Sequence, residues 1–258
     1  MILNYKVFGD ENTDVLMILH GLFGMLDNWT TLAKKFAKKY KVYAIDLRNH
    51  GKSPHSDVMS YESMSEDLKE FMEAEGIYTA NIIGHSMGGK ALMTFGNMYP
   101  EHIERMIVVD IAPKAYEPKH NEIIEALTKL PLNKMSTRDE AEYWLSQRIE
   151  QASVRLFLLK NLLRTKNGFQ WKMNLPVIIK FYQEIIGSIN IDNGFERPIL
   201  MVYGGSSDYL NEDDIEELDL VYDNVKFEQV EGTGHWVHAE KPNEFFELVS
   251  NFLESELY

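Results

Sequence analysis

The chain has no cysteine among its 258 residues. This absence excludes a disulfide framework, a thiolate nucleophile and a cysteine-ligated metal site. No apolar run approaches the ~20 residues that a membrane-spanning helix needs, so we expect no membrane span. The first residues also lack the basic segment and the apolar stretch that form a secretory signal. We therefore expect a cytoplasmic protein.

The chain also has few basic residues relative to acidic ones. There are 26 lysines and arginines against 40 aspartates and glutamates, which gives a formal net charge of −14 at pH 7. Proteins that bind nucleic acid neutralise its phosphates with basic patches, so we expect no nucleic-acid partner. The length suits one α/β domain with an insertion, present as a monomer or a small homo-oligomer.

What the sequence does contain is an alternation of strands and helices. Strand-like segments at residues 15–19, 41–45 and 103–109 are each separated from the next by helical patterns. Such alternation predicts a mostly parallel sheet flanked by helices on both faces. In sheets of this kind ligands bind at the carboxyl ends of the strands, and the polar residues discussed below follow strand ends.

The alternation stops after about residue 111. From residue 112 to residue 193 we expect no strand, only helices near 121–130, 138–150, 153–164 and 176–186. Four helical patterns without an intervening strand predict an all-helical cap over the strand edge. The core is then expected in residues 1–111 and 194–258, because the alternation resumes near Pro198.

The residues around Ser86 are typical of a nucleophile elbow. An apolar strand meets the Gly-x-Ser-x-Gly motif of residues 84–88, and a helical pattern follows. This strand, sharp turn and helix present a serine hydroxyl above the sheet, and glycines let the two backbones approach closely. The oxyanion formed after attack needs two N–H donors, which we expect from Met87 and from Leu22, with Phe23 as an alternative to Leu22.

A serine hydroxyl needs a base that takes its proton, and His235 is the expected one. It follows the last strand-like segment in a glycine-containing loop, late in the chain. Two aspartates compete to orient it: Asp110, at the end of a buried strand, and Asp208, in the loop after the next core strand. We favour Asp110, because a buried carboxylate must find a partner. His238 has no third ligand at recognisable spacing, so we expect no metal.

Substrate size should depend on the cap. Its apolar and aromatic side chains lie just after Asp110 in the chain. We expect Phe157 and Trp171 of the cap to line the pocket, together with Trp236 next to His235.

Across its length the chain resembles the α/β-hydrolase superfamily, and within it the YbfF-like esterase subfamily. The matching stretches are His20-Gly-Leu-Phe-Gly-x-x-Asp-Asn28, Arg48-Asn-His-Gly-x-Ser-Pro54, Gly84-His-Ser-Met-Gly-Gly-Lys90, Asp110-Ile-Ala-Pro113, Phe157-Leu-Leu-Lys160, Gly204-Gly-x-Ser207 and Gly234-His-Trp-Val-His-Ala-Glu-Lys-Pro242. The resemblance implies serine esterase or thioesterase activity, no cofactor, a helical lid and an acid at the Asp110 position. The chain departs from the subfamily at Asp208, where relatives tend to carry a non-acidic residue.

The expected function is hydrolysis of carboxylic esters, including acyl thioesters, through an acyl-enzyme. Two alternatives share this fold. One is a carbon–carbon lyase or hydrolase of the menaquinone-pathway type, which would have a tight, polar pocket. The other is a ligand receptor on a hydrolase scaffold, which would show a burst without steady turnover.

Overall fold

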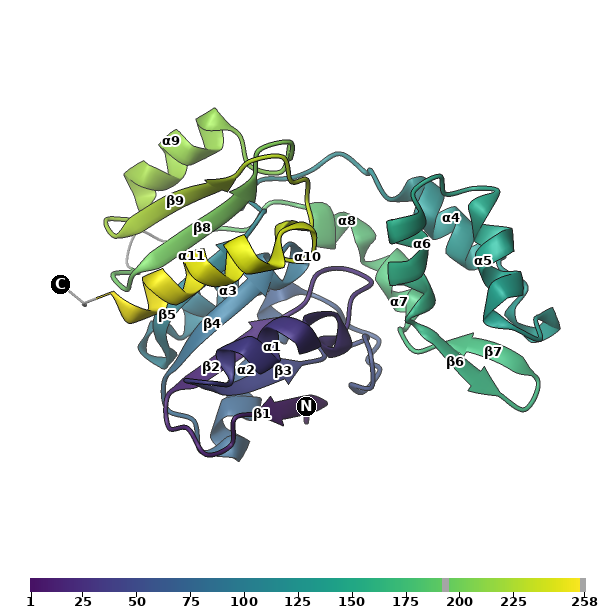
Figure 1. The fold of residues 1–258 in the computed structure, drawn as a ribbon, viewed down its shortest axis with the longest axis horizontal. Helices are drawn as coiled ribbons and strands as arrows, with labels where there is room; N and C mark the ends of the chain where they lie inside the picture. Colours follow the sequence, from purple (N-terminus) through teal and green to yellow (C-terminus); the bar gives the residue numbers. More distant parts are fainter. Residues whose placement is uncertain (192–194, 256–258) are drawn as a thin grey trace.

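The computed structural model describes residues 1–191 and 195–255. Within these ranges, seven strands form one sheet in the order β1-β3-β2-β4-β5-β8-β9 (Figure 1). Every neighbouring pair is parallel except the edge pair of β1 and β3. The strands are β1 Tyr5–Phe8, β2 Val15–Leu19, β3 Lys41–Ile45, β4 Ala80–His85, β5 Ile103–Val109, β8 Ile199–Gly204 and β9 Val225–Val230. The predicted mostly parallel sheet is confirmed.

Helices cover both faces of this sheet. On β2, Leu16 and Ile18 point to one face while Met17 and Leu19 point to the other, and all four are buried. The first face packs against α1 and α11, and the second against α2 and α3. The core helices are η1 Leu26–Trp29, α1 Thr30–Phe36, α2 Tyr61–Glu75, α3 Met87–Met98, η2 Pro100–His102, α9 Glu212–Val221, α10 Val237–Glu240 and α11 Pro242–Glu254.

The cap lies between β5 and β8 in the chain and stands to one side of the sheet (Figure 1). Its helices are α4 Asn121–Lys129, η3 Leu132–Lys134, α5 Arg138–Ser146, α6 Ala152–Leu159, α7 Leu175–Lys180 and α8 Tyr182–Ile186. The predicted boundary between residues 193 and 194 lies outside the described residues.

The prediction that the cap is all-helical is wrong. The helix expected over residues 153–164 ends at Leu159, and a hairpin of β6 Leu162–Thr165 and β7 Gly168–Trp171 follows. Gly168 has a φ of 103°, a conformation that side-chain-bearing residues rarely adopt, so it allows the tight turn that joins the strands. The leucines before this turn match a helical pattern as well as a strand, and pairing with β7 decides between them.

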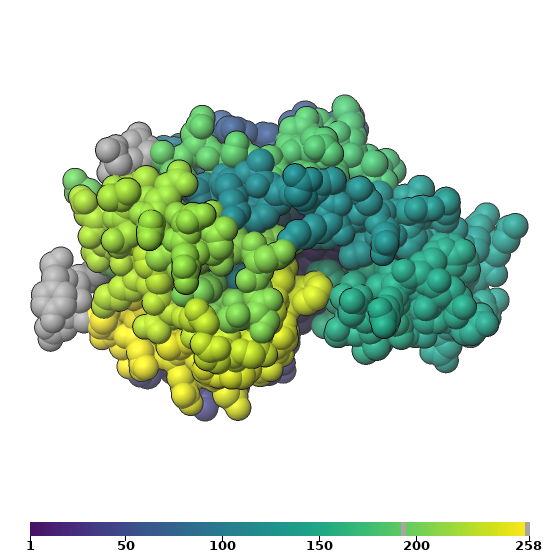
Figure 2. Space-filling view, turned by 90° about the horizontal axis from the view of Figure 1, so that it is seen from above, coloured from purple at the N-terminus to yellow at the C-terminus, as the bar shows by residue number. Residues whose placement is uncertain are grey.

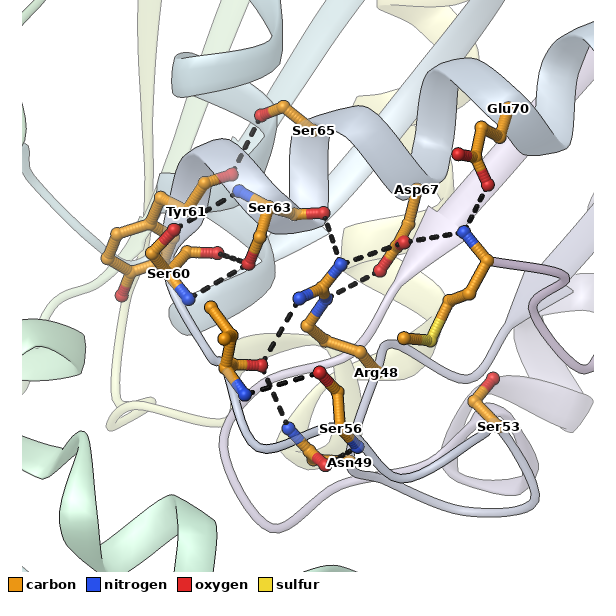
Figure 3. Close-up of polar contacts among 12 residues, drawn as sticks. Arg48, Asn49, Ser53, Ser56, Ser60, Tyr61, Ser63, Ser65, Asp67 and Glu70 are labelled. Atoms are coloured by element: carbon orange, nitrogen blue, oxygen red, sulfur yellow. Dashed lines mark hydrogen bonds and ion pairs between the residues drawn. The ribbon is translucent and has the colours of Figure 1, made fainter.

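The loop after β3 is anchored by Arg48 (Figure 3). Its guanidinium donates two hydrogen bonds to the carboxylate of Asp67 on α2, at 2.6 and 2.9 Å, and a third to the carbonyl of Ser63 at 2.9 Å. Both charged groups are buried, and their pairing in a bidentate geometry offsets the loss of hydration. The Arg-Asn-His-Gly motif therefore fixes this loop, and its His50 faces the site described next.

No helix within residues 1–191 and 195–255 is both long and apolar enough to cross a bilayer.

Candidate active site

Ser86 sits on a strained turn between β4 and α3. Its φ of 53° and ψ of −118° are unusual for a residue with a side chain, as expected of a nucleophile elbow. The glycines on either side make the turn possible: a Cβ on Gly84 would lie 2.4 Å from the carbonyl oxygen of Gly88. A Cβ on Gly88 would lie 2.6 Å from that of His20. The structure thus has the close approach that the motif predicts.

His235 connects Ser86 to Asp110. Its Nε2 lies 2.9 Å from the Ser86 hydroxyl oxygen, and its Nδ1 lies 2.7 Å from Oδ2 of Asp110. A carboxylate only accepts, so Nδ1 carries the hydrogen and Nε2 is left to accept from the serine. The ring of Tyr209 stacks on the imidazole, with centroids 3.7 Å apart and planes 19° apart. Ring orientation is thus fixed by two hydrogen bonds and one stacking partner.

Asp110 is the carboxylate that the fold places beside His235. It is 1% exposed and has a φ of 51°, which turns it across the end of β8. Its Oδ1 accepts from the backbone N–H of Gly204 at 2.9 Å, and its Oδ2 accepts from the Ser207 hydroxyl at 2.5 Å. A Cβ on Gly204 would lie 2.3 Å from the carbonyl oxygen of Gly234, so glycine is needed where these loops cross.

Asp208, the alternative acid, faces another partner. Its side chain is 74% exposed and forms an ion pair with Lys119 of the cap. The hydrogen bond from Lys119 holds the pKa of this carboxyl below its usual value. The structure therefore brings Ser86, His235 and Asp110 into one chain of hydrogen bonds and pairs Asp208 with a lysine instead.

The N–H groups expected to bind the oxyanion differ in whether another acceptor already occupies them. Among the described residues, the backbone N–H groups of Leu22 and Met87 donate no hydrogen bond. Met87 is the first residue of α3, where the helix dipole favours negative charge. The N–H of Phe23 donates to Nε2 of His50 at 3.2 Å, so the alternative assignment to Phe23 is wrong. The histidine that occupies this N–H, His50, belongs to the Arg-Asn-His-Gly motif, so the sequence already contained it.

A cavity of about 310 Å³ lies above Ser86, between core and cap. Figure 2 shows a hollow between the C-terminal part of the core, in yellow-green, and the cap, in teal. Phe157 and Trp236 line the cavity as expected, with ring centroids 6.2 Å apart. Trp171 does not: its indole donates to the carbonyl of Leu127 within the cap, which contradicts the predicted pocket role. A smaller cavity of about 30 Å³ adjoins Ser86 beside Leu22 and Met87.

Three other histidines around the site, His20, His85 and His238, are buried. Burial lowers the pKa of His238 to about 3 and that of His20 to about 4, and it lowers the pKa of His85 well below its usual value. These rings stay neutral near neutral pH and serve packing and hydrogen bonds. His20, for example, accepts from the N–H of Leu47 at 3.0 Å.

Sequence reasoning missed two residues that contact His235 and Asp110. Tyr209 stacks on His235, and Ser207 binds Asp110. Ser207 belongs to the Gly204-Gly-x-Ser207 stretch, which carried part of the subfamily resemblance, so its signal was present in the sequence. Tyr209 has no comparable sequence signal, because its contact depends on how the loop folds back.

A family model described as the alpha/beta hydrolase fold matches residues 14–242. The chain belongs to the alpha/beta hydrolase family. Its relatives in this family include esterases and lipases. The chain is 36% identical to the sn-1-specific diacylglycerol lipase ABHD11 of Xenopus tropicalis over 262 residues, covering 98% of this chain and 82% of that protein. It is 35% identical to Esterase YbfF of Escherichia coli over 244 residues, covering 94% of both.

The solved structure of a marine microorganism esterase is similar throughout. Its TM-score is 0.94 and its identity 40%, over 98% of this chain and 99% of that one. The alpha/beta hydrolase described here is thus an enzyme of the esterase and lipase type, and its resemblance to YbfF-like esterases is confirmed.

Proposed function

We propose that the protein is a serine esterase whose catalytic triad is Ser86, His235 and Asp110. The observation that carries this proposal is the unbroken chain of hydrogen bonds from Asp110 through His235 to Ser86, at the foot of a cavity between core and cap. Geometry and roles define such a triad, rather than sequence position.

The reaction proceeds in two halves. His235 Nε2 takes the proton of the Ser86 hydroxyl as its oxygen attacks the ester carbonyl carbon. The negative charge that develops on the carbonyl oxygen is stabilised by the N–H groups of Leu22 and Met87. His235 then gives the proton to the leaving alcohol, and an acyl-enzyme remains. Water, deprotonated by the same histidine, attacks this ester and releases the acid.

The pocket favours substrates with an apolar portion. Its walls include side chains from both lobes, such as Ile123, Val154, Phe157, Leu158 and Trp236. A carboxylic ester of this kind would bury its hydrocarbon against these residues, at about 25 cal/mol per Å² of apolar surface. Acyl thioesters carry the same carbonyl centre and belong to the proposed substrate class.

Replacing Ser86 with alanine tests this assignment. We expect kcat for an activated acyl ester to fall by about 10⁵- to 10⁶-fold, with an unchanged melting temperature, because the serine is needed for chemistry and contributes little to packing. Hydrolysis rates across acyl esters and acyl-CoA thioesters of graded length would define the substrate. Retention of more than a few per cent of activity, with contamination excluded, would remove Ser86 as the nucleophile.

The two alternatives lead to different results in the same assays. A carbon–carbon hydrolase needs a tight, polar pocket, whereas the wall named above is largely apolar. A receptor on this scaffold would release one equivalent of alcohol and then stop. Steady turnover of acyl esters after the first equivalent would exclude the receptor.

Cellular location and assembly stay predictions from the sequence. We expect the protein in the cytoplasm, as a monomer or a small homo-oligomer without nucleic acid. Cell fractionation and light scattering of the purified chain test these expectations.

A further inference from the structure

Lys90 lies on α3, four residues after Ser86, and its side chain is buried. Its ammonium nitrogen donates to the carbonyl of Lys114 at 2.7 Å and to that of Gly187 at 2.6 Å. The catalytic steps above do not use this lysine. Burial of an amine is unfavourable unless it is hydrogen-bonded, so its partners indicate why it is tolerated there.

The two partners lie on the two segments that join core and cap. The entry crossing is residues 112–116 and leads from β5 into the cap, and the exit crossing is residues 185–190 and leads back toward β8. The crossings pair with each other: the N–H of Tyr116 donates to the carbonyl of Ile186, and the N–H of Ile189 donates to that of Pro113, both at 2.8 Å. Together they form a short double-stranded hinge.

Lys90 binds both strands of this hinge. Its side chain donates one hydrogen bond to each crossing. Tyr61 of α2 makes a single tie, from its hydroxyl to the carbonyl of Ile185 at 2.6 Å. The hinge is therefore attached to the helix that begins directly after the nucleophile.

The entry crossing also reaches the catalytic histidine. The Lys90 ammonium lies 4.8 Å from the centroid of the Tyr116 ring. The Tyr116 hydroxyl donates to the carbonyl of Tyr209 at 2.6 Å, and Tyr209 stacks on His235. Displacement of the entry crossing would thus disturb the partner that holds the imidazole.

We propose that Lys90 is a positioning residue that locks both crossings onto α3 and so fixes the cap over Ser86. The cap walls the pocket of the proposed esterase, so the effect on catalysis rests on that function. The effect on the hinge does not depend on it.

Burial lowers the pKa of Lys90 to about 7. Loss of the proton still leaves two N–H donors on the amine, one for each carbonyl. The ring of Tyr116 faces the Lys90 ammonium, and Tyr61, Glu117 and His120 line the same small cavity. The two ties can persist on both sides of this titration, so the lock holds across neutral pH.

Amide hydrogen exchange of the whole chain tests the lock directly, because the Tyr116 and Ile189 amides pair the crossings. Lys90→Met keeps the side-chain length and removes the donors. We expect exchange in both crossings to accelerate by about tenfold or more as the hinge opens locally. Tyr61→Phe removes one tie rather than two, so it should accelerate exchange in the paired crossings less than Lys90→Met does. Lys129→Met, on an exposed cap lysine, is the matched control and should exchange like the wild type in both.

Kinetics give the second measurement. Lys90→Met should raise KM for a long-chain ester by about fivefold more than KM for an acetate ester, since only the long chain reaches the cap. If Ser86 turned over no ester at all, the proposed function would fail while exchange still decided the role of Lys90. Exchange equal to the wild type in both crossings would overturn that role.

A second variant keeps the test decisive if Lys90→Met does not fold. Lys90→Gln keeps two N–H donors on a shorter side chain, so its exchange rates should fall between those of the wild type and Lys90→Met. If Lys90→Met does not fold, faster exchange of Lys90→Gln in both crossings supports the lock. Wild-type exchange in Lys90→Gln would then count against it.

Discussion

At the scale of single residues, the carboxylate of Asp110 is held by three partners on two other segments. It is buried and accepts from His235, from the N–H of Gly204 and from the hydroxyl of Ser207. A buried carboxylate must find hydrogen-bond partners, and these three donors supply them. In the proposed mechanism this carboxylate faces the imidazole where a positive charge appears during the reaction.

Asp110→Asn should lower kcat by roughly 10³- to 10⁴-fold, because the amide favours the wrong imidazole tautomer and cannot balance the imidazolium. Steady-state hydrolysis of an activated ester measures this loss. Circular dichroism and the melting temperature would show whether the variant keeps its fold.

Asp208→Asn is the matched control for that variant. Asp208 is exposed and paired with Lys119, so we expect less than about a tenfold loss of kcat. The reverse order of the two losses would make Asp208 the acid.

At the scale of elements, one aromatic side chain of the cap lines the cavity while another packs inside the cap. Phe157 on α6 faces the cavity and lies near Trp236, whereas Trp171 on β7 donates to Leu127 and belongs to the cap's own packing. The hairpin thus braces the cap while α6 forms the wall of the pocket.

Replacing Phe157 with alanine should change the preference among acyl-chain lengths, since it removes apolar surface from the wall. A loss of about 1.5–3 kcal/mol of burial corresponds to roughly a tenfold or larger change in kcat/KM for the best-fitting chain. Trp171→Ala should instead lower the melting temperature and leave the order of preference intact. If Phe157→Ala lowered kcat/KM equally for all esters, the role of Phe157 in the pocket wall would be contradicted.

At the scale of the whole molecule, several buried histidines link stability to pH. Burial lowers the pKa of His20 to about 4. Burial is also the largest cause that lowers the pKa values of His50 and His238 to about 3. In the unfolded chain these groups have a pKa of about 6.5. Between pH 6.5 and pH 4 the unfolded chain therefore binds more protons, and the free energy of unfolding falls as pH falls.

Calorimetric melting between pH 7 and pH 4 should show this loss as a steadily falling melting temperature. His238→Phe removes one titrating ring from the stack on Trp29, where the rings lie 4.0 Å apart, and should reduce the fall. A melting temperature that stays level from pH 6.5 to pH 4 would contradict the claim that these buried histidines are neutral in the folded protein.

Local chemistry let the sequence by itself determine the sheet, the tight turn at Ser86 and the place of His235 at the edge of the sheet. A largely apolar, β-branched segment such as residues 103–109, set between helical patterns, is typical of a buried strand. The glycines around Ser86 are needed wherever strand and helix backbones touch, whatever the rest of the chain does. His235 was recognisable because strand-end loops of a parallel sheet share one edge.

Only the tertiary structure decided what depends on distant partners. Asp110, rather than Asp208, contacts His235 because its backbone turns across the end of β8, while Lys119 of the cap pairs with the Asp208 carboxylate. Phe23 loses its free N–H to His50, which lies 27 positions later. The hairpin of residues 162–171 forms because its two strands can pair, and a leucine-rich stretch fits a helix equally well until that partner is present.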